Sequence, residues 1–281
     1  MINLANIFSV IKEDYISPSY SYHFKLISIL FILLPFVLIT GPFLPDLFLC
    51  LIGLYFLIIS IKKSLFKYYQ NKSVFIFSLF YLYLLIRGIF SEYPYESLIE
   101  YNGPIFYFRY LFFVLGIQYL LDTNPKLIKA FCFSLLIVLL FTIFDGYLQW
   151  IIGVNFFGYN IEQNRLSGLF GKEKILGHFL SHLVPLSLGL LIYIFELNKK
   201  NIILFMTFLV ISEVLIFVSN DRAGFLKIFQ FTLLLILLSN NFKLYRIITF
   251  CISLILIALI LNFSQSSIKR YSATISDVSS T

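Results

Sequence analysis

Two long apolar runs are joined by the segment Asn164-Arg165-Leu166-Ser167-Gly168-Leu169-Phe170-Gly171-Lys172-Glu173-Lys174-Ile175-Leu176-Gly177-His178. It contains three glycines, one serine and four charged residues, whereas the chain on either side is almost entirely apolar. Glycines and polar side chains in such surroundings are typical of a loop that carries chemistry or recognition. We therefore expect the rest of the chain to form the frame that holds this segment.

The composition indicates a protein that crosses a membrane several times. Hydrophobic residues make up 60% of the 281-residue chain and charged residues only 12%, and the mean hydropathy is +0.92. Soluble proteins carry about a quarter charged residues, and apolar runs of roughly 20 residues match the thickness of a bilayer. We predict an all-α integral membrane protein, a polytopic helical bundle, and exclude the class of water-soluble domains.

Nine apolar runs are predicted to be transmembrane helices. They cover residues 26–40, 47–61, 74–90, 104–121, 127–150, 175–195, 202–218, 225–238 and 247–263. The first two are short, so a re-entrant hairpin is an alternative to two full crossings. Residues 1–25 are interpreted as a cytoplasmic lead, residues 26–263 as the transmembrane domain and residues 264–281 as the start of a further polar region. The segment quoted above lies largely within a predicted outer loop, residues 151–174, which we call the motif loop.

The distribution of charge gives an orientation. Lysines gather in alternate loops, most clearly at Lys62, Lys63, Lys67 and Lys72, and most acidic residues fall in the other loops. Because lysine and arginine collect on the cytoplasmic side, the N-terminus is expected inside and residue 281 outside. The net charge of +7 is accordingly attributed to topology, and no nucleic-acid partner is predicted.

Four arginines are exceptions to this distribution, because they fall on the predicted outer side: Arg87, Arg109, Arg165 and Arg222. A guanidinium group is always charged and presents a planar fork of donors that suits phosphate oxygens. Together with the glycine-rich loop, the arginines favour a site for a lipid-linked phosphate or diphosphate. The alternative is local pairing, of Arg165 with Glu162 or Glu173 and of Arg222 with Asp221.

Three further titratable residues leave alternatives open. Glu213 lies within a predicted span, where a carboxylate is costly, and is expected either to pair with an arginine or to lie near the interface. His178 and His182 share one helical face at the start of a span. That pair suits a metal or a general base, but no third ligand is evident in the sequence, so helix packing or an interfacial hydrogen bond is the favoured interpretation. No metal or cofactor is predicted.

At the motif loop the sequence resembles the family of O-antigen ligases and O-antigen polymerases, which are bacterial inner-membrane glycosyltransferases. The run from Arg165 to Glu173 resembles the family's R-x-S-G-x-F-G-D-E loop, and Ile175-Leu176-Gly177 its entry into the next span. The run from Ser219 to Phe225, Ser-Asn-Asp-Arg-Ala-Gly-Phe, resembles the family's S-G-E-R-T-A-F turn. The likeness covers the layout of essentially the whole chain.

The resemblance implies transfer of a glycan from undecaprenyl diphosphate to an acceptor sugar such as the lipid A core, at the periplasmic face. It implies catalytic roles for Arg165 and Arg222, with Glu173 orienting an arginine. Substrate-binding positions would be Arg87, Arg109, Ser167, Gly168, Gly171 and Asp221. Membrane lipid is an expected partner.

The sequence departs from the family pattern at several positions. Lys172 stands where the family usually has aspartate, His182 where arginine is common, and Asn220-Asp221 where the family has Gly-Glu. The family continues into a large periplasmic region with a histidine proposed as the base, so the chain is interpreted as an N-terminal fragment or a diverged relative. Remaining alternatives are a polymerase of the same family, a protein O-glycosylating enzyme, a transporter of an anionic lipid, and a non-catalytic scaffold for lipid-linked saccharides.

Overall fold

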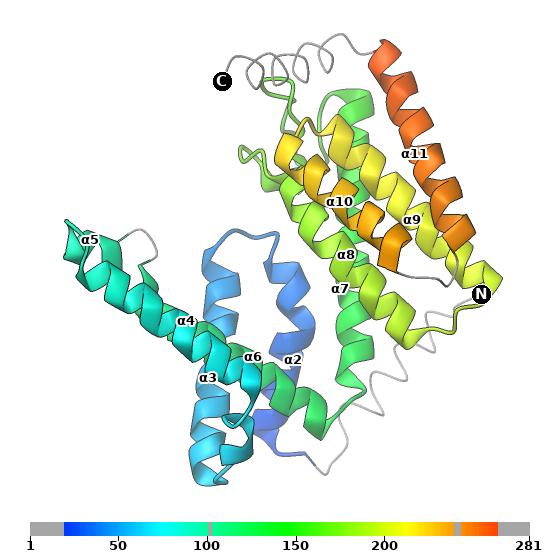
Figure 1. Ribbon diagram of the computed structural model, residues 1–281. Helices are drawn as coiled ribbons and strands as arrows, with labels where there is room; N and C mark the ends of the chain where they lie inside the picture. The colour runs from blue at the N-terminus through cyan, green and yellow to red at the C-terminus, as the bar shows by residue number, and fades with distance from the viewer. Residues whose placement is uncertain (1–19, 101–102, 239–242, 264–281) are drawn as a thin grey trace. The chain divides into compact units, whose positions relative to one another are not determined.

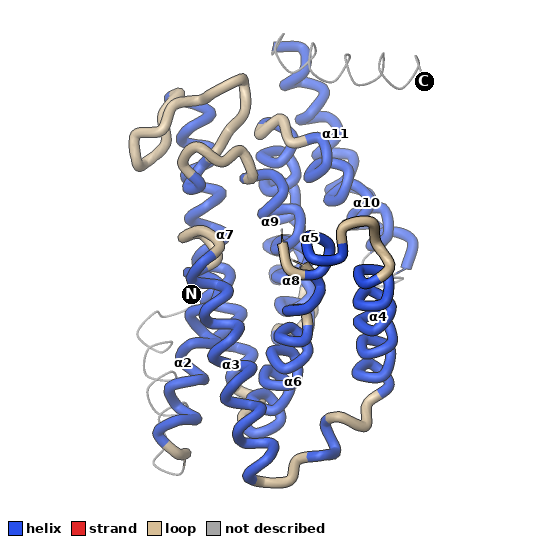
Figure 2. Tube along the Cα trace, turned by 90° about the vertical axis from the view of Figure 1, so that its left-hand side faces the viewer, coloured by secondary structure: helices blue, strands red, loops and turns tan. Residues whose placement is uncertain are grey.

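The computed structural model describes residues 20–100, 103–238 and 243–263 (Figure 1). Within these residues the chain is helical, and the only β-type pairing is two isolated bridges in the motif loop (Figure 2). Seven of the described helices are long and apolar enough to cross a membrane, by length and composition. The prediction of an all-α membrane-embedded protein is therefore confirmed at this level. The chain divides into two compact units between Phe131 and Cys132.

The first unit contains the helices that correspond to the first four predicted spans, together with short helices in the connections. Its elements are α2 (Tyr22–Val37), α3 (Phe43–Lys62), η1 (Phe66–Tyr68), α4 (Lys72–Ile89), α5 (Pro94–Leu98), η2 (Pro104–Phe106) and α6 (Phe108–Thr123). The short α5, in the acidic loop that follows α4, was not predicted. Proline at its first position suits a helix start, because proline has no N–H to leave unpaired there.

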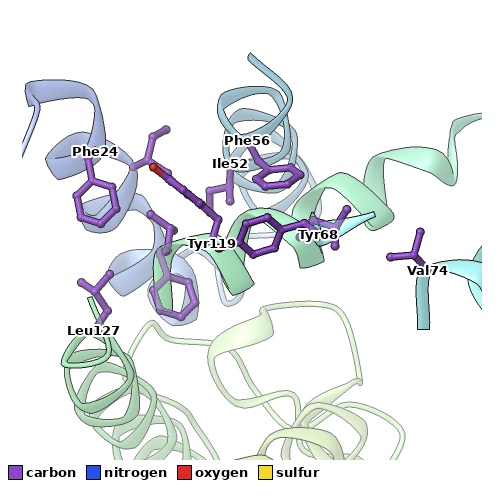
Figure 3. Close-up of a cluster of buried hydrophobic side chains, with 11 residues drawn as sticks. Phe24, Ile52, Phe56, Tyr68, Val74, Tyr119 and Leu127 are labelled. Atoms are coloured by element: carbon purple, nitrogen blue, oxygen red, sulfur yellow. The ribbon is translucent and has the colours of Figure 1, made fainter. Parts of the chain in front are cut away.

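The core of the first unit lies where α3 and α6 pack together. The helices approach closely at two glycines: a β-carbon on Gly53 would lie 3.3 Å from Cβ of Phe112, and one on Gly116 would lie 3.0 Å from Ile52. Aromatic rings fill the space beside this crossing (Figure 3). The ring centroid of Tyr119 lies 6.2 Å from that of Phe56 and 6.1 Å from that of Tyr68.

The second unit contains the motif loop and the helices around it. Its elements are α7 (Leu127–Ile152, whose first residues belong to the first unit), η3 (Gly168–Phe170), α8 (Leu176–Ile194), α9 (Lys199–Val218), α10 (Arg222–Leu238) and α11 (Lys243–Phe263). Helix α9 packs against α8, α10 and α11, and these four helices are seen together in Figure 1. It is the most buried of the membrane-length helices, so it forms the core of this unit.

The nine predicted spans all coincide with helices, and the differences are at their ends. Helix α2 begins at Tyr22, inside the predicted N-terminal lead, and α11 begins at Lys243, inside a predicted polar loop. Helices α2 and α10, with 16 and 17 residues, are shorter than the seven membrane-length helices. Most of the predicted lead and the predicted tail, residues 264–281, lie outside the described residues.

Of the two situations that the sequence suggested for Glu213, pairing with an arginine is not found among the described residues, and a place near the interface stays a prediction. Glu213 lies within α9, is 5% exposed, and accepts a hydrogen bond from the hydroxyl of Thr232 on α10. Among the described residues it forms no ion pair with an arginine. A buried carboxyl held by a hydroxyl on the neighbouring helix fits the rule that polar groups inside a membrane find partners in the bundle.

Candidate functional site

Gln149, a buried residue near the end of α7, binds the backbone of the motif loop. Its Oε1 accepts the backbone N–H groups of Ser167, at 3.0 Å, and of Gly168, at 2.8 Å. Its Nε2 donates to the carbonyl of Tyr159, at 3.1 Å, and to Oγ of Ser167, at 3.2 Å. Because Gln149 is fully buried, these bonds take the place of the water that would otherwise satisfy the loop backbone.

Asp145 lies one turn earlier on the same face of α7 and holds the first part of the loop. Its Oδ1 accepts the N–H of Phe156 at 2.8 Å, while Oδ2 is buried with no hydrogen-bond partner among the described residues. Asn155 completes the arrangement by donating to the carbonyl of Gly168 at 2.5 Å and accepting the N–H of Tyr159 at 2.7 Å. The two ends of the loop are thereby tied together above α7.

Glycine is required at two predicted substrate-binding positions of the loop. Gly168 and Gly171 have φ angles of +53° and +64°, a region that other residues rarely adopt. A β-carbon on Gly171 would also lie 3.2 Å from the ring of Tyr159. Ser167 is buried, and its side chain contacts Gln149. These three residues shape the loop in the structure, and their predicted contact with a substrate remains a prediction.

The structure brings the motif loop and the turn before α10 together. The Nη2 atom of Arg165 lies 3.8 Å from Oδ2 of Asp221 and donates to the carbonyl of Lys174 at 2.7 Å. The side-chain amide of Asn220 donates to the carbonyl of Asn164 at 2.6 Å. Both asparagines have positive φ angles, +57° and +55°, which asparagine tolerates better than most residues.

The partner of Arg165 therefore differs from both of the nearby acids considered from the sequence. Glu162 pairs instead with Lys174, at 3.5 Å between Nζ and Oε2. The carboxylate of Glu173 is exposed and meets no cation among the described residues, so the orienting role predicted for it has no such contact. Arg165 keeps 24% of its side chain exposed, and its Nε is buried without a hydrogen-bond partner within the described chain.

Helices α8 and α10 begin side by side because two glycines allow a close approach. A β-carbon on Gly177 would lie 2.6 Å from Cβ of Asp221 and from Oγ of Ser219, and one on Gly224 would lie 2.7 Å from the backbone of Gly177. Asp221 accepts the N–H of Gly224 at 3.1 Å. Arg222, the first residue of α10, is half-buried at this end of the unit.

His178 and His182 share one face of α8, as predicted, with ring centroids 4.5 Å apart. Both rings face Lys227 on α10, whose Nζ lies 3.4 Å from Nδ1 of His178 and 3.3 Å from Nε2 of His182. No group of three or more metal-ligating side chains occurs among the residues that the structure describes.

The two other predicted arginines belong to the first unit. Arg109 forms an ion pair with Asp46, at 2.7 Å between Nη1 and Oδ2, and lines a cavity of about 680 Å³ with Pro42, Tyr107 and neighbouring apolar residues. Arg87, near the end of α4, donates to the hydroxyl of Tyr83 one turn earlier, at 3.4 Å. Arg109 is therefore paired with an acid on the neighbouring helix α3.

Sequence reasoning missed the residues that build the site, namely Asp145, Gln149, Asn155 and Lys227. A usable signal was present for the first two: a carboxyl and an amide spaced one turn apart inside an apolar run, where lone polar groups are costly. Lys227 carried no such signal.

We compared the chain with models of known protein families, with curated proteins and with solved structures, and none of the three comparisons found a match.

Proposed function

We propose that this protein is a membrane glycosyltransferase of the O-antigen ligase type. It moves a glycan from undecaprenyl diphosphate to an acceptor sugar such as the lipid A core, in lipopolysaccharide or surface polysaccharide assembly. In this proposal nine helices span the bacterial inner membrane, with the N-terminus in the cytoplasm, residue 281 outside and the motif loop at the periplasmic face.

The observation that carries the proposal is the meeting of two motifs that are far apart in the chain. The side-chain amide of Asn220 reaches the backbone of Asn164, 56 residues earlier, at 2.6 Å, and Arg165 lies 3.8 Å from Asp221. The two motifs that carry the family resemblance thus form one structure, with Arg165 and Arg222 at the same end of the unit.

The chemistry of such a transfer suits these side chains. When the bond between sugar and diphosphate breaks, negative charge grows on the leaving diphosphate. Guanidinium groups that are already positioned stabilise that charge more in the transition state than in the ground state. Arg165 is positioned by Asp221 and by the carbonyl of Lys174, so it needs little rearrangement to receive an anion.

The proposal is tested by measuring transfer in proteoliposomes that contain a polyprenyl-diphosphate-linked glycan and a lipid A-core acceptor. We expect Arg165→Ala and Arg222→Ala each to lower the rate by about 10²- to 10³-fold, the range seen when one stabilising donor is removed from an active site. Lys200→Ala, at the opposite end of α9, is the matched control and should transfer normally.

Each other result has a defined meaning. Normal transfer by both arginine variants would refute the assignment of these residues. If the unaltered protein transferred no glycan, either to the lipid A-core acceptor or to a second glycan offered in place of that acceptor, the scaffold or transporter alternative would be favoured. Chain extension without the lipid A-core acceptor would identify a polymerase of the same family.

A further inference from the structure

Lys227 and the two histidines of α8 form a cluster that neither motif includes. Its Nζ lies within 3.4 Å of one ring nitrogen of each histidine, and both rings are exposed. Among the described residues Lys227 forms no ion pair with a carboxylate. An ammonium group whose only partners are two imidazoles retains its full positive charge toward the surroundings.

The hydrogen bonds define how the rings are protonated in this arrangement. Nδ1 of His182 lies 2.8 Å from the carbonyl oxygen of His178, and a carbonyl only accepts, so Nδ1 carries the hydrogen. Nε2 of His182 and Nδ1 of His178 then accept from the ammonium of Lys227. Each of these two ring nitrogens thus offers its lone pair to the same ammonium group.

The neighbouring charges also favour an anion. The other titratable or charged groups that act on His178 are His182 on α8, Lys227 on α10 and Asp221 in the turn before α10. Asp221 has partners of its own in Arg165, at 3.8 Å, and in the N–H of Gly224. The first turns of α8 and α10 lie side by side here, and helix N-termini carry partial positive charge.

We infer that His178, His182 and Lys227 form a phosphate-binding site that takes up protons when it is filled. A phosphate or diphosphate group offers enough oxygens for all three side chains. As an anion enters, Lys227 turns its donors from the imidazoles to the phosphate, and each released ring nitrogen binds a proton from solvent and becomes a second donor. The result is a set of charge-assisted hydrogen bonds, which are the strong class.

A metal ion fits this cluster less well than an anion. The two ring nitrogens converge on one position, as they would on a metal, but that position is occupied by the ammonium of Lys227. A metal and an ammonium exclude each other there, whereas an anion attracts the lysine and both protonated rings.

The inference is tested with the purified protein in nanodiscs and inorganic pyrophosphate as the probe. Binding is measured by titration calorimetry between pH 5.5 and 8, in two buffers of different ionisation enthalpy. Histidine changes its charge between about pH 5 and 8. For each proton taken up on binding, the affinity for pyrophosphate should therefore fall by up to about tenfold per pH unit as the pH rises. The heat should depend on the buffer and report net proton uptake.

Two pairs of variants separate the site from general effects. Lys227→Met should abolish the proton-linked part of pyrophosphate binding, whereas Lys227→Arg keeps the charge and should retain it. His182→Gln should lower the number of protons taken up, and His23→Gln on α2 should not. Thermal unfolding of each variant shows whether it is folded. The inference would be overturned if the unaltered protein bound pyrophosphate without proton uptake, or if proton-linked binding survived in folded Lys227→Met.

Further arms identify the source of the phosphate and exclude the competing chemistry. Vesicles with and without phosphatidic acid replace pyrophosphate in the same assay, and binding to the lipid alone, lost in Lys227→Met, would assign the site to a headgroup. Tight binding of Zn²⁺ that depends on both histidines and is strengthened in Lys227→Met would overturn the site in favour of a metal.

The inference rests on the proposed function only for the lipid that would carry the phosphate. If glycan transfer is observed without pH-dependent pyrophosphate binding, the site alone is refuted, and the converse result refutes the transferase alone.

Discussion

Replacing Gln149 with leucine should loosen the motif loop without disturbing the helix that carries it. Leucine has a similar size and suits a buried helical position, but it leaves the N–H groups of Ser167 and Gly168 without their acceptor. Each buried N–H that loses its partner costs about 1–3 kcal/mol. Taking about 3 kcal/mol for the pair, and about 1.4 kcal/mol per factor of ten, the loop should open roughly 100-fold more often.

Hydrogen exchange followed by mass spectrometry measures this opening directly. Peptides that cover residues 164–170 should exchange about two orders of magnitude faster in Gln149→Leu, whereas peptides from α9 should be unchanged. Gln118→Leu is the matched control, because Gln118 is an exposed glutamine on α6 whose side chain forms no hydrogen bond within the part of the chain that the structure describes. If Gln149→Leu and Gln118→Leu gave the same exchange in the loop, Gln149 would not be its anchor and the reasoning would be refuted.

Two further predictions concern packing and charge. Gly177→Ala should destabilise the protein by about 1–3 kcal/mol through overpacking, since its β-carbon would lie 2.6 Å from Asp221; Gly189→Ala on the same helix, where nothing lies within 4 Å, should cost nothing or stabilise. Equal unfolding temperatures for the two variants would contradict this close approach. Asp46→Asn should change stability by less than about 1 kcal/mol, because the pair with Arg109 is partly exposed, with side-chain exposures of 41% and 27%; a larger loss in thermal unfolding would show that the pair is structurally essential.

The helices could be predicted from the sequence because each apolar run ends at a clear signal. Lysines, prolines and acidic clusters separate the nine runs, and every run coincides with a helix in the structure. Their ends were less predictable. Helix α11 begins at Lys243, four residues before the predicted span, and so includes Arg246, whose guanidinium donates to the carbonyl of Leu235 on α10. A charged side chain with a partner on a neighbouring helix does not end a helix, and sequence alone does not reveal that partner.

The motif loop could be located from the sequence, but its internal construction could not. The sequence favoured a phosphate site for Arg165 and offered a neighbouring acid as the alternative partner. In the structure Arg165 pairs with Asp221, because α8 and α10 cross at Gly177 and Gly224. That crossing depends on tertiary packing, which local spacing does not encode. Gln149 was overlooked because it is the single amide in a strongly apolar run, which was interpreted only as a transmembrane helix.

The polar residues inside α7 also bear on how the protein is made. As the ribosome delivers the chain, α7 emerges before residues 156–168, so Asp145 and Gln149 leave the ribosome ahead of the partners they have in the finished fold. The nascent helix then holds two unsatisfied groups at one end until the following segment emerges and closes over them. The polar contacts at this end of the unit are therefore completed only after the motif loop has emerged.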